Sequence, residues 1–204
     1  MISASLPLLL GSQSPRRKDI LESLRIPFTV LPADVPEHVE AGETPAAYLE
    51  RIVDIKLSAV ARRVKESPRP LSAILVADTV VVLGTAILGK PSDIEDAVRL
   101  LTDLCGQTHR VITRYAVAAR APFDRAMLAR SVATEVTLRA ASPAQIRRYA
   151  ESGEGLDKAG AYAAQGLGAF LVERVQGSYT SVVGLPAAEL IADLGALGLL
   201  GEYP

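Results

Sequence analysis

The sequence is poor in cysteine and in net charge, and each shortage excludes a class of protein. The single cysteine, Cys105, cannot form an internal disulfide and fits a reducing compartment. The formal net charge of −1 gives no bulk electrostatic attraction to nucleic acid or to an anionic membrane. Any anion that binds must therefore be held by local clusters of basic side chains.

Export signals and long apolar runs are also missing. The apolar run from Leu6 to Leu10 is too short for a signal peptide, and no basic region precedes it. No stretch approaches the roughly 18 uninterrupted apolar residues that a membrane span needs. We therefore expect a cytoplasmic protein that has neither a membrane nor a nucleic acid as its partner.

Several familiar active-site signatures do not occur either. The chain contains no GxxxxGK[ST] loop, no GxGxxG turn, no GxSxG elbow and no HExxH helix. The P-loop, Rossmann and α/β-hydrolase interpretations therefore lose support.

What is present predicts an α/β protein with a mixed sheet. The chain has 204 residues, 49% of them hydrophobic, and no linker or repeat divides it, so we expect a single domain over residues 1–204. Apolar runs and stripes predict strands that end near residue 10 and cover 73–88, 109–119, 131–140 and 169–176, with helices that begin near residues 15, 45, 92, 143 and 186. Hairpins mix with helical connections, which favours a mixed twisted sheet with flanking helices.

Local signals give the ends of several helices. Ser14 before Pro15, and Thr44 before the next proline, are typical N-caps. Ser92 and Glu95 have the spacing of a capping box. Gly84 and Thr85 are expected to form the turn of the hairpin.

Two charged residues interrupt apolar patterns. Asp78 lies within the strand run ILVADTVVV, where a carboxylate needs a cation, a metal or hydrogen-bond donors to offset burial. It is either a capped structural aspartate at a bulge or a metal ligand or general base that faces a cleft. Lys56 lies in the apolar stripe of its helix, one turn after Ile52, and either extends outward to water or serves a site.

Basic residues also gather where a helix begins. Arg16, Arg17 and Lys18 occupy the first turn of the predicted helix, although helix N-termini favour negative charge. Lys90 follows the hairpin and is either a surface lysine or a second cation of a site, and Glu37 would ordinarily be solvated. Arginine and lysine bind phosphate oxygens, while aspartate and glutamate bind Mg²⁺. This set therefore favours a nucleotide polyphosphate with its metal.

The segment GEGLDKAGAYAAQGLG, residues 153–168, is irregular and rich in glycine. It is either a flexible loop or a backbone that approaches a ligand closely. His109, at the start of a strand, is expected to be an ordinary surface or structural histidine rather than a catalytic one, and Cys105 is expected to pack in the core.

Five ordered segments carry a family resemblance: GSQSPRRKDIL, ADTVVVL…ILGKP, LCGQTHRVITRYAV, GEGLDKAGAYAAQG and GSYTSVVGLP. Over nearly the whole chain they resemble the motifs of the Maf family of nucleoside triphosphate pyrophosphatases, also known as septum-formation inhibitors. The resemblance implies two lobes around a cleft, a fold related to the inosine triphosphate pyrophosphatases, and a possible homodimer.

It also implies cleavage between the α and β phosphates with a divalent metal, Mg²⁺ or Mn²⁺. On the matching positions it assigns Glu37 and Asp78 to the metal, with Asp78 also taking the proton of the attacking water. The residues that it implies for catalysis and substrate binding are Ser12, Arg16, Glu37, Lys56, Asp78, Thr79, Lys90 and Gln165.

Arg16, Thr79 and Gln165 resemble the subfamily that acts on dTTP and UTP. Ala164 replaces a larger aliphatic residue of many members, and Gly89 a glutamate of some. Two alternatives stay open: a relative that acts on 7-methyl-GTP or CTP, and a nucleotide-binding regulator of cell division without turnover.

Overall fold

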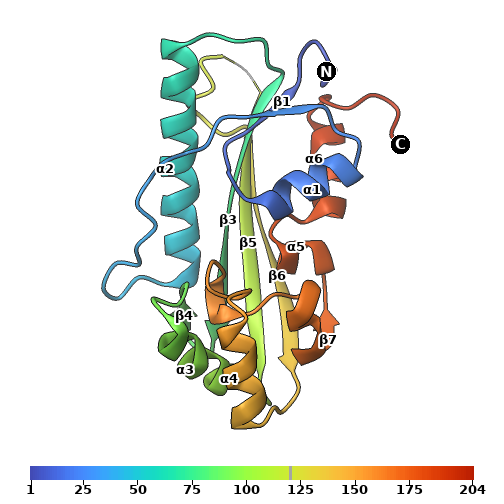
Figure 1. Cartoon of the computed structure of the whole chain (residues 1–204). Helices are drawn as coiled ribbons and strands as arrows, with labels where there is room; N and C mark the ends of the chain where they lie inside the picture. The colour runs from blue at the N-terminus through green and yellow to red at the C-terminus, as the bar shows by residue number, and fades with distance from the viewer. Residues whose placement is uncertain (120) are drawn as a thin grey trace. The chain divides into compact units, whose positions relative to one another are not determined.

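The structure is a computed structural model that describes residues 1–119 and 121–204 (Figure 1). In these residues the strands form one sheet in the order β2-β1-β3-β5-β6-β7, with β4 paired to β3. The strands are β1 (Leu8–Leu10), β2 (Phe28–Val30), β3 (Ala73–Leu83), β4 (Ala86–Leu88), β5 (Thr108–Ala118), β6 (Leu128–Leu138) and β7 (Val172–Gln176).

Strand β1 pairs in parallel with β2 and β3, whereas the β3–β4 and β6–β7 pairs are antiparallel. The predicted mixed α/β sheet is therefore confirmed. The helices are α1 (Pro15–Ser23), α2 (Pro45–Glu66), α3 (Ile94–Leu104), α4 (Pro143–Glu151), α5 (Tyr179–Val183) and α6 (Ala187–Ala196), with 3₁₀ turns η1 (Ala159–Ala161) and η2 (Gly166–Leu171).

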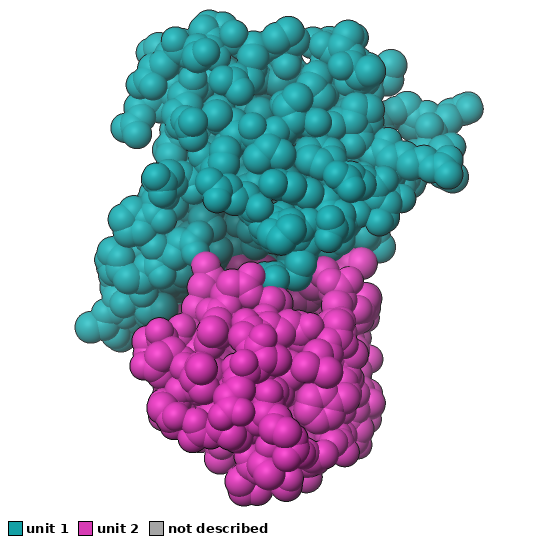
Figure 2. Space-filling model, in the orientation of Figure 1, with its two compact units in different colours: residues 1–78, 113–131, 184–204 teal, residues 79–112, 132–183 magenta. Residues whose placement is uncertain are grey.

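The chain divides into two compact units (Figure 2). Unit 1 consists of Met1–Asp78, Thr113–Ser131 and Gly184–Pro204, and unit 2 of Thr79–Ile112 and Val132–Val183. Strands β3, β5 and β6 each contribute residues to both units.

Each unit has its own hydrophobic core. In unit 1, the apolar stripe of α2 packs on β1, β3 and β5, with Val53, Leu57 and Val60 against Leu9 and Ile74. In unit 2, α3 and α4 cover the other portions of β3, β5 and β6, and their contacts include Leu101, Leu104, Tyr149, Val111 and Val136. Because each stripe is apolar, a polar side chain within it must find a partner.

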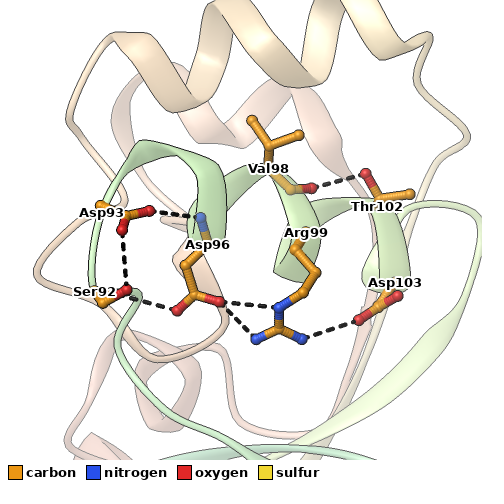
Figure 3. A network of polar contacts seen from close by, with 7 residues as sticks. All are labelled: Ser92, Asp93, Asp96, Val98, Arg99, Thr102 and Asp103. Atoms are coloured by element: carbon orange, nitrogen blue, oxygen red, sulfur yellow. Dashed lines mark hydrogen bonds and ion pairs between the residues drawn. The ribbon is translucent and has the colours of Figure 1, made fainter.

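The expected helix starts are confirmed at α1, α2 and α4, but the expected capping box of α3 is wrong. The N-cap is Asp93, whose Oδ1 accepts a hydrogen bond of 2.8 Å from the amide of Asp96 (Figure 3). The helix therefore begins one residue later than the Ser92–Glu95 spacing predicts, and the Ser92 hydroxyl donates to the carboxylate of Asp93. Glu95 pairs with Arg147 of α4 rather than with the helix start.

Two strand predictions also differ from the structure. Strand β2 (Phe28–Val30) is not among the predicted strands, because it has only three residues and prolines lie on both sides of it. The strand expected from residue 169 begins at Val172, because the residues before it form η2. The expected hairpin turn is confirmed, with Gly84 at φ +60° between β3 and β4.

Candidate active site

A buried lysine joins two carboxylates in unit 1. Lys56 of α2 is only 4% exposed, and its ammonium lies 2.7 Å from Oδ1 of Asp78 and 2.6 Å from Oε1 of Glu37. The same nitrogen donates to the carbonyl of Ala77 at 3.4 Å. The apolar stripe of α2 directs this side chain onto β3, so Lys56 does not extend to water.

Asp78 is 7% exposed and lies within β3, most of whose residues are also buried. Glu37 comes from the irregular segment between β2 and α2, and its side chain is 35% exposed. Breaking a buried ion pair by removing one partner typically costs about 3–5 kcal/mol, because it leaves a buried charge without compensation. Lys56 and the two carboxylates therefore stabilise one another in this buried position.

A second buried cation, Arg17, belongs to this cluster, although it is not among the predicted site residues. Arg17 of α1 is 8% exposed and donates from Nε to the carbonyl of Gly184 at 2.9 Å. It also donates from Nη1 to Oγ of Ser12 at 3.0 Å. The pKa of Arg17 is lowered overall, mainly by burial and further by the positive charge of Arg16. The negative charges of Asp78 and Glu37 oppose this shift.

A signal in the sequence could have identified Arg17. It precedes Ile20 and Leu21 by three and four residues, so it shares the buried face of α1 with them. Arg16, the arginine predicted to bind substrate, is half-buried, and its positive charge lowers the pKa of Arg17. The positive start of α1 thus faces the carboxylates of Asp78 and Glu37, which supply negative charge to an arginine of its first turn.

Ser12 lies in the turn between β1 and α1. Its Oγ accepts hydrogen bonds from Arg17 and from the amide of Ser14, the latter at 3.2 Å. A hydroxyl that accepts two bonds still has one hydrogen to donate. The structure therefore brings Ser12, Arg17, Glu37, Lys56 and Asp78 into one connected set of polar contacts and charges.

The other predicted site residues belong to unit 2. Thr79 directly follows Asp78 in β3 and is half-buried, Lys90 is exposed just after β4, and Gln165 is exposed at the start of η2. The roles predicted for these three residues stay predictions.

The glycine-rich segment of unit 2 is ordered by bonds within the chain. The amides of Leu167 and Gly168 donate to the carboxylate of Glu154 at 2.8 and 2.7 Å. Lys158 bonds the backbone carbonyl of Glu154 and the side chain of Asp157. Two amides that could have approached a ligand are thus bound by a side chain of the same unit.

His109 is structural, as expected. It is 2% exposed, its Nε2 lies 2.8 Å from the hydroxyl of Tyr162, and burial lowers its pKa from 6.5 to about 4. Cys105 is half-buried and packs against the core of unit 2, which confirms its predicted place.

Glu37 and Asp78 are the two side chains predicted to hold a divalent metal. The described residues contain no group of three or more histidine, cysteine, aspartate or glutamate side chains that could hold a metal ion. Glu37 and Asp78 do direct one oxygen each to a single cation, the Lys56 ammonium. Mg²⁺ is commonly bound by one or two carboxylates together with substrate phosphates and water, so this pair of donors fits such an ion.

Within residues 1–119 and 121–204, no helix is both long and apolar enough to cross a bilayer.

With this geometry in place, comparison with known proteins identifies the family. The chain belongs to the Maf family, because the model of Maf-like proteins matches residues 7–197. It is 47% identical over 192 residues to a dTTP/UTP pyrophosphatase of Myxococcus xanthus, which covers 94% of this chain and 93% of the relative.

Two other relatives have the same name. The dTTP/UTP pyrophosphatase of Saccharophagus degradans is 45% identical, over 91% of this chain and 86% of its own. That of Geobacter sulfurreducens is 42% identical, over 95% of this chain and 97% of its own. Among solved structures, the Ham1 protein of Staphylococcus aureus aligns with a TM-score of 0.46 and 13% identity, over 94% of this chain and 99% of that one.

Proposed function

We propose that this protein is a nucleoside triphosphate pyrophosphatase that converts dTTP and UTP to the monophosphate and pyrophosphate. The observation that carries the proposal is the buried Lys56 between Glu37 and Asp78, with Arg17 in the same cluster. Relatives at 42–47% identity over nearly the full chain are named dTTP/UTP pyrophosphatases.

The reaction is an attack of water on the α-phosphorus. The new bond joins the water oxygen to phosphorus, the bond from phosphorus to the bridging oxygen breaks, and pyrophosphate leaves with that oxygen. Asp78 accepts the proton of the water as general base. Arg16, Lys56 and Lys90 balance the negative charge that moves onto the leaving pyrophosphate.

Glu37 and Asp78 would hold a divalent cation, Mg²⁺ or Mn²⁺, as hard oxygen donors do. When bound, that cation supplies Lewis acidity at the phosphate oxygens. Ser12 donates its hydroxyl hydrogen to a phosphate oxygen, which matches its position beside Arg17. Because phosphates are common to all nucleotides, these residues bind triphosphates without choosing the base.

The choice of base is assigned to Gln165, with Thr79. An amide side chain offers one donor and one acceptor, and the uracil or thymine edge presents the complementary pattern. Cytosine replaces an acceptor with a donor and would leave a polar group unpaired, at a cost of about 1–3 kcal/mol. We therefore expect dTTP and UTP to exceed CTP by roughly tenfold to a hundredfold in kcat/KM.

The test is pyrophosphate release by the purified protein from dTTP, UTP, CTP, GTP and 7-methyl-GTP, each with Mg²⁺, with Mn²⁺ and with a chelator. Release from dTTP and UTP that is lost with the chelator is the expected result. A lead of CTP or 7-methyl-GTP by about tenfold would overturn the base assignment and leave the pyrophosphatase proposal intact. Tight binding of dTTP without pyrophosphate release would instead indicate a regulator without turnover.

Two further properties belong to the same proposal. We expect a homodimer, which light scattering of the purified protein tests directly, and we expect a cytoplasmic location, which fractionation of cells tests.

A further inference from the structure

Gln165 is exposed and lies in the short connection between η1 and η2, so its side chain can select a base only if the backbone around it is fixed. An unfixed loop must be ordered on binding, and the loss of freedom weakens selectivity. Residues 163–168 of unit 2 are held on both sides of Gln165 by two side chains that carry no role so far.

The downstream side is held by Glu154. Its Oε1 accepts from the amide of Leu167 at 2.8 Å, and its Oε2 accepts from the amide of Gly168 at 2.7 Å. One carboxylate therefore binds the second and third amides after Gln165. Hydrogen bonds to a charged acceptor are roughly twice as strong as neutral ones.

The upstream side is held by Tyr149 of α4, which is 2% exposed. Its hydroxyl accepts from the amide of Ala163 at 3.0 Å and donates to Oε2 of Glu154 at 2.9 Å. The hydroxyl thus links the backbone two residues before Gln165 to the carboxylate that holds the backbone after it. We refer to this pair as the Glu154–Tyr149 clamp.

Two glycines make room for the clamp. A Cβ on Gly166, which has φ +65°, would lie 2.3 Å from Oε1 of Glu154. A Cβ on Gly168 would lie 2.5 Å from the hydroxyl oxygen of Tyr149 and 2.4 Å from the carbonyl oxygen of Ala163. Real Cβ atoms do not approach this closely, so the clamp and the glycines on either side of Leu167 form one arrangement.

Glu154 itself is anchored and ionised. Lys158 bonds its backbone carbonyl, and its amide donates to Oγ of Ser152 at 3.3 Å. Burial raises the pKa of Glu154, but the bonds from Gly168, Leu167 and Tyr149 outweigh it and the pKa is lowered. The carboxylate is therefore charged at neutral pH.

From these contacts we infer that Glu154 and Tyr149 are positioning residues that set base selectivity by fixing the backbone on both sides of Gln165. The inference rests on the proposed function, in which Gln165 recognises the base. It predicts that loosening the clamp changes the ranking of bases far more than the turnover of a saturating substrate.

The test compares Glu154→Gln, Tyr149→Phe and Gln165→Leu with the matched control Glu173→Gln, whose carboxylate is exposed on β7. For Glu154→Gln we expect the ratio of kcat/KM for dTTP over CTP to fall about tenfold, mainly through KM for dTTP. The kcat for dTTP should stay within about threefold of the unmodified protein. Tyr149→Phe keeps the buried ring and should lower the ratio less, and Glu173→Gln should leave it unchanged.

A double variant separates positioning from general loosening. If the clamp acts through Gln165, then Glu154→Gln lowers the ratio no further in a Gln165→Leu background. Hydrogen exchange gives a readout without activity: the amides of Leu167 and Gly168 should exchange at least about tenfold faster in Glu154→Gln. If that variant does not fold, Tyr149→Phe decides by the same two measurements.

Three outcomes overturn the inference while the unmodified protein is active: an unchanged ratio in Glu154→Gln, an unchanged ratio in Gln165→Leu, or additive losses in the double variant. A protein that releases pyrophosphate from none of the triphosphates overturns the proposed function, and the inference with it.

Discussion

Unit 1 contains two buried aspartates that are stabilised in different ways. Asp193 of α6, 3% exposed, receives both ends of the Arg130 guanidinium, from Nη2 at 2.6 Å and from Nε at 2.8 Å, and also the hydroxyl of Tyr115. Asp78, 7% exposed, receives the ammonium of Lys56, which it shares with Glu37.

The difference lies in the geometry of the partner. An arginine fork fits one carboxylate in one orientation, whereas an ammonium is a compact charge on a flexible stem. The partners of Asp193 therefore suit a permanent link between α6 and the strands β5 and β6. The partner of Asp78 can serve two carboxylates and can turn to a third anion, such as a phosphate, without losing its charge.

The largest expected effect is on chemistry at Asp78. Asp78→Asn keeps the size of the side chain but removes the general base, so kcat should fall by about 10²-fold or more. The melting temperature should change little, because Glu37 still pairs with Lys56. Pyrophosphate release and thermal unfolding of the same preparation check both halves; turnover near that of the unmodified protein would refute the assignment.

The second effect is on stability at Asp193. Asp193→Asn removes the charge that accepts the bonds of Arg130 and Tyr115; because the Arg130 side chain is 46% exposed and can still be hydrated, the loss should be about 1–3 kcal/mol of unfolding free energy. Turnover of dTTP, measured well below the melting temperature, should be retained. Urea unfolding gives the free energy, and a large loss of kcat in the folded variant would erase the contrast with Asp78.

His109 is a buried titratable group that, within the described part of the chain, has no charged partner, unlike the two aspartates. Burial lowers the pKa of His109 from 6.5 to about 4, and its Nδ1 has no hydrogen-bond partner among the described residues. Between these two pH values the unfolded chain binds the proton more tightly than the folded one. The contribution of neutral His109 to the free energy of unfolding is thus complete above pH 6.5. It is lost as the pH falls toward 4, by up to about 3 kcal/mol.

This pH dependence is measured by urea unfolding at intervals between pH 4 and 7. His109→Asn should flatten the curve across that window, whereas His38→Asn, on an exposed loop, serves as the control. An equal slope in all three proteins would show that other groups cause the acid sensitivity.

The smallest expected effect is on substrate binding at Lys90. This lysine is exposed, so its substitution is compared with that of the buried Lys56. Lys90→Met should weaken all triphosphates by a similar factor of about ten, with no change in stability. Lys56→Met should weaken them similarly and also destabilise unit 1, since Glu37 and Asp78 would then repel each other. A changed ranking of bases in either variant would contradict a role at the phosphates.

Much of this architecture could be predicted from the sequence, because the signals are local. The stripe of α2, the cap at Thr44 and the run of β3 each lie within one element. Lys56 and Asp78 stood out for the same reason, since each interrupts an apolar pattern.

What could not be predicted depends on partners far away in the chain. Glu95 has capping spacing, yet it pairs with Arg147, 52 residues later. Arg17 looked like one of three equivalent cations, and its role appears only with its acceptor at Gly184. Glu154 lies among glycines that suggest a flexible loop, whereas its bonds to Leu167 and Gly168 order that loop.

The bond from Arg17 to Gly184 also bears on the order in which the protein is completed during synthesis. Unit 1 is assembled from three separate stretches of chain, and Gly184 opens the last of them, whereas both stretches of unit 2 precede it. A nascent chain can therefore complete unit 2 before Arg17 meets its acceptor. The charge cluster of Arg17, Lys56 and Asp78 is consequently among the last parts of the molecule to gain its full set of bonds, and a chain interrupted before Gly184 would carry these charges without that support.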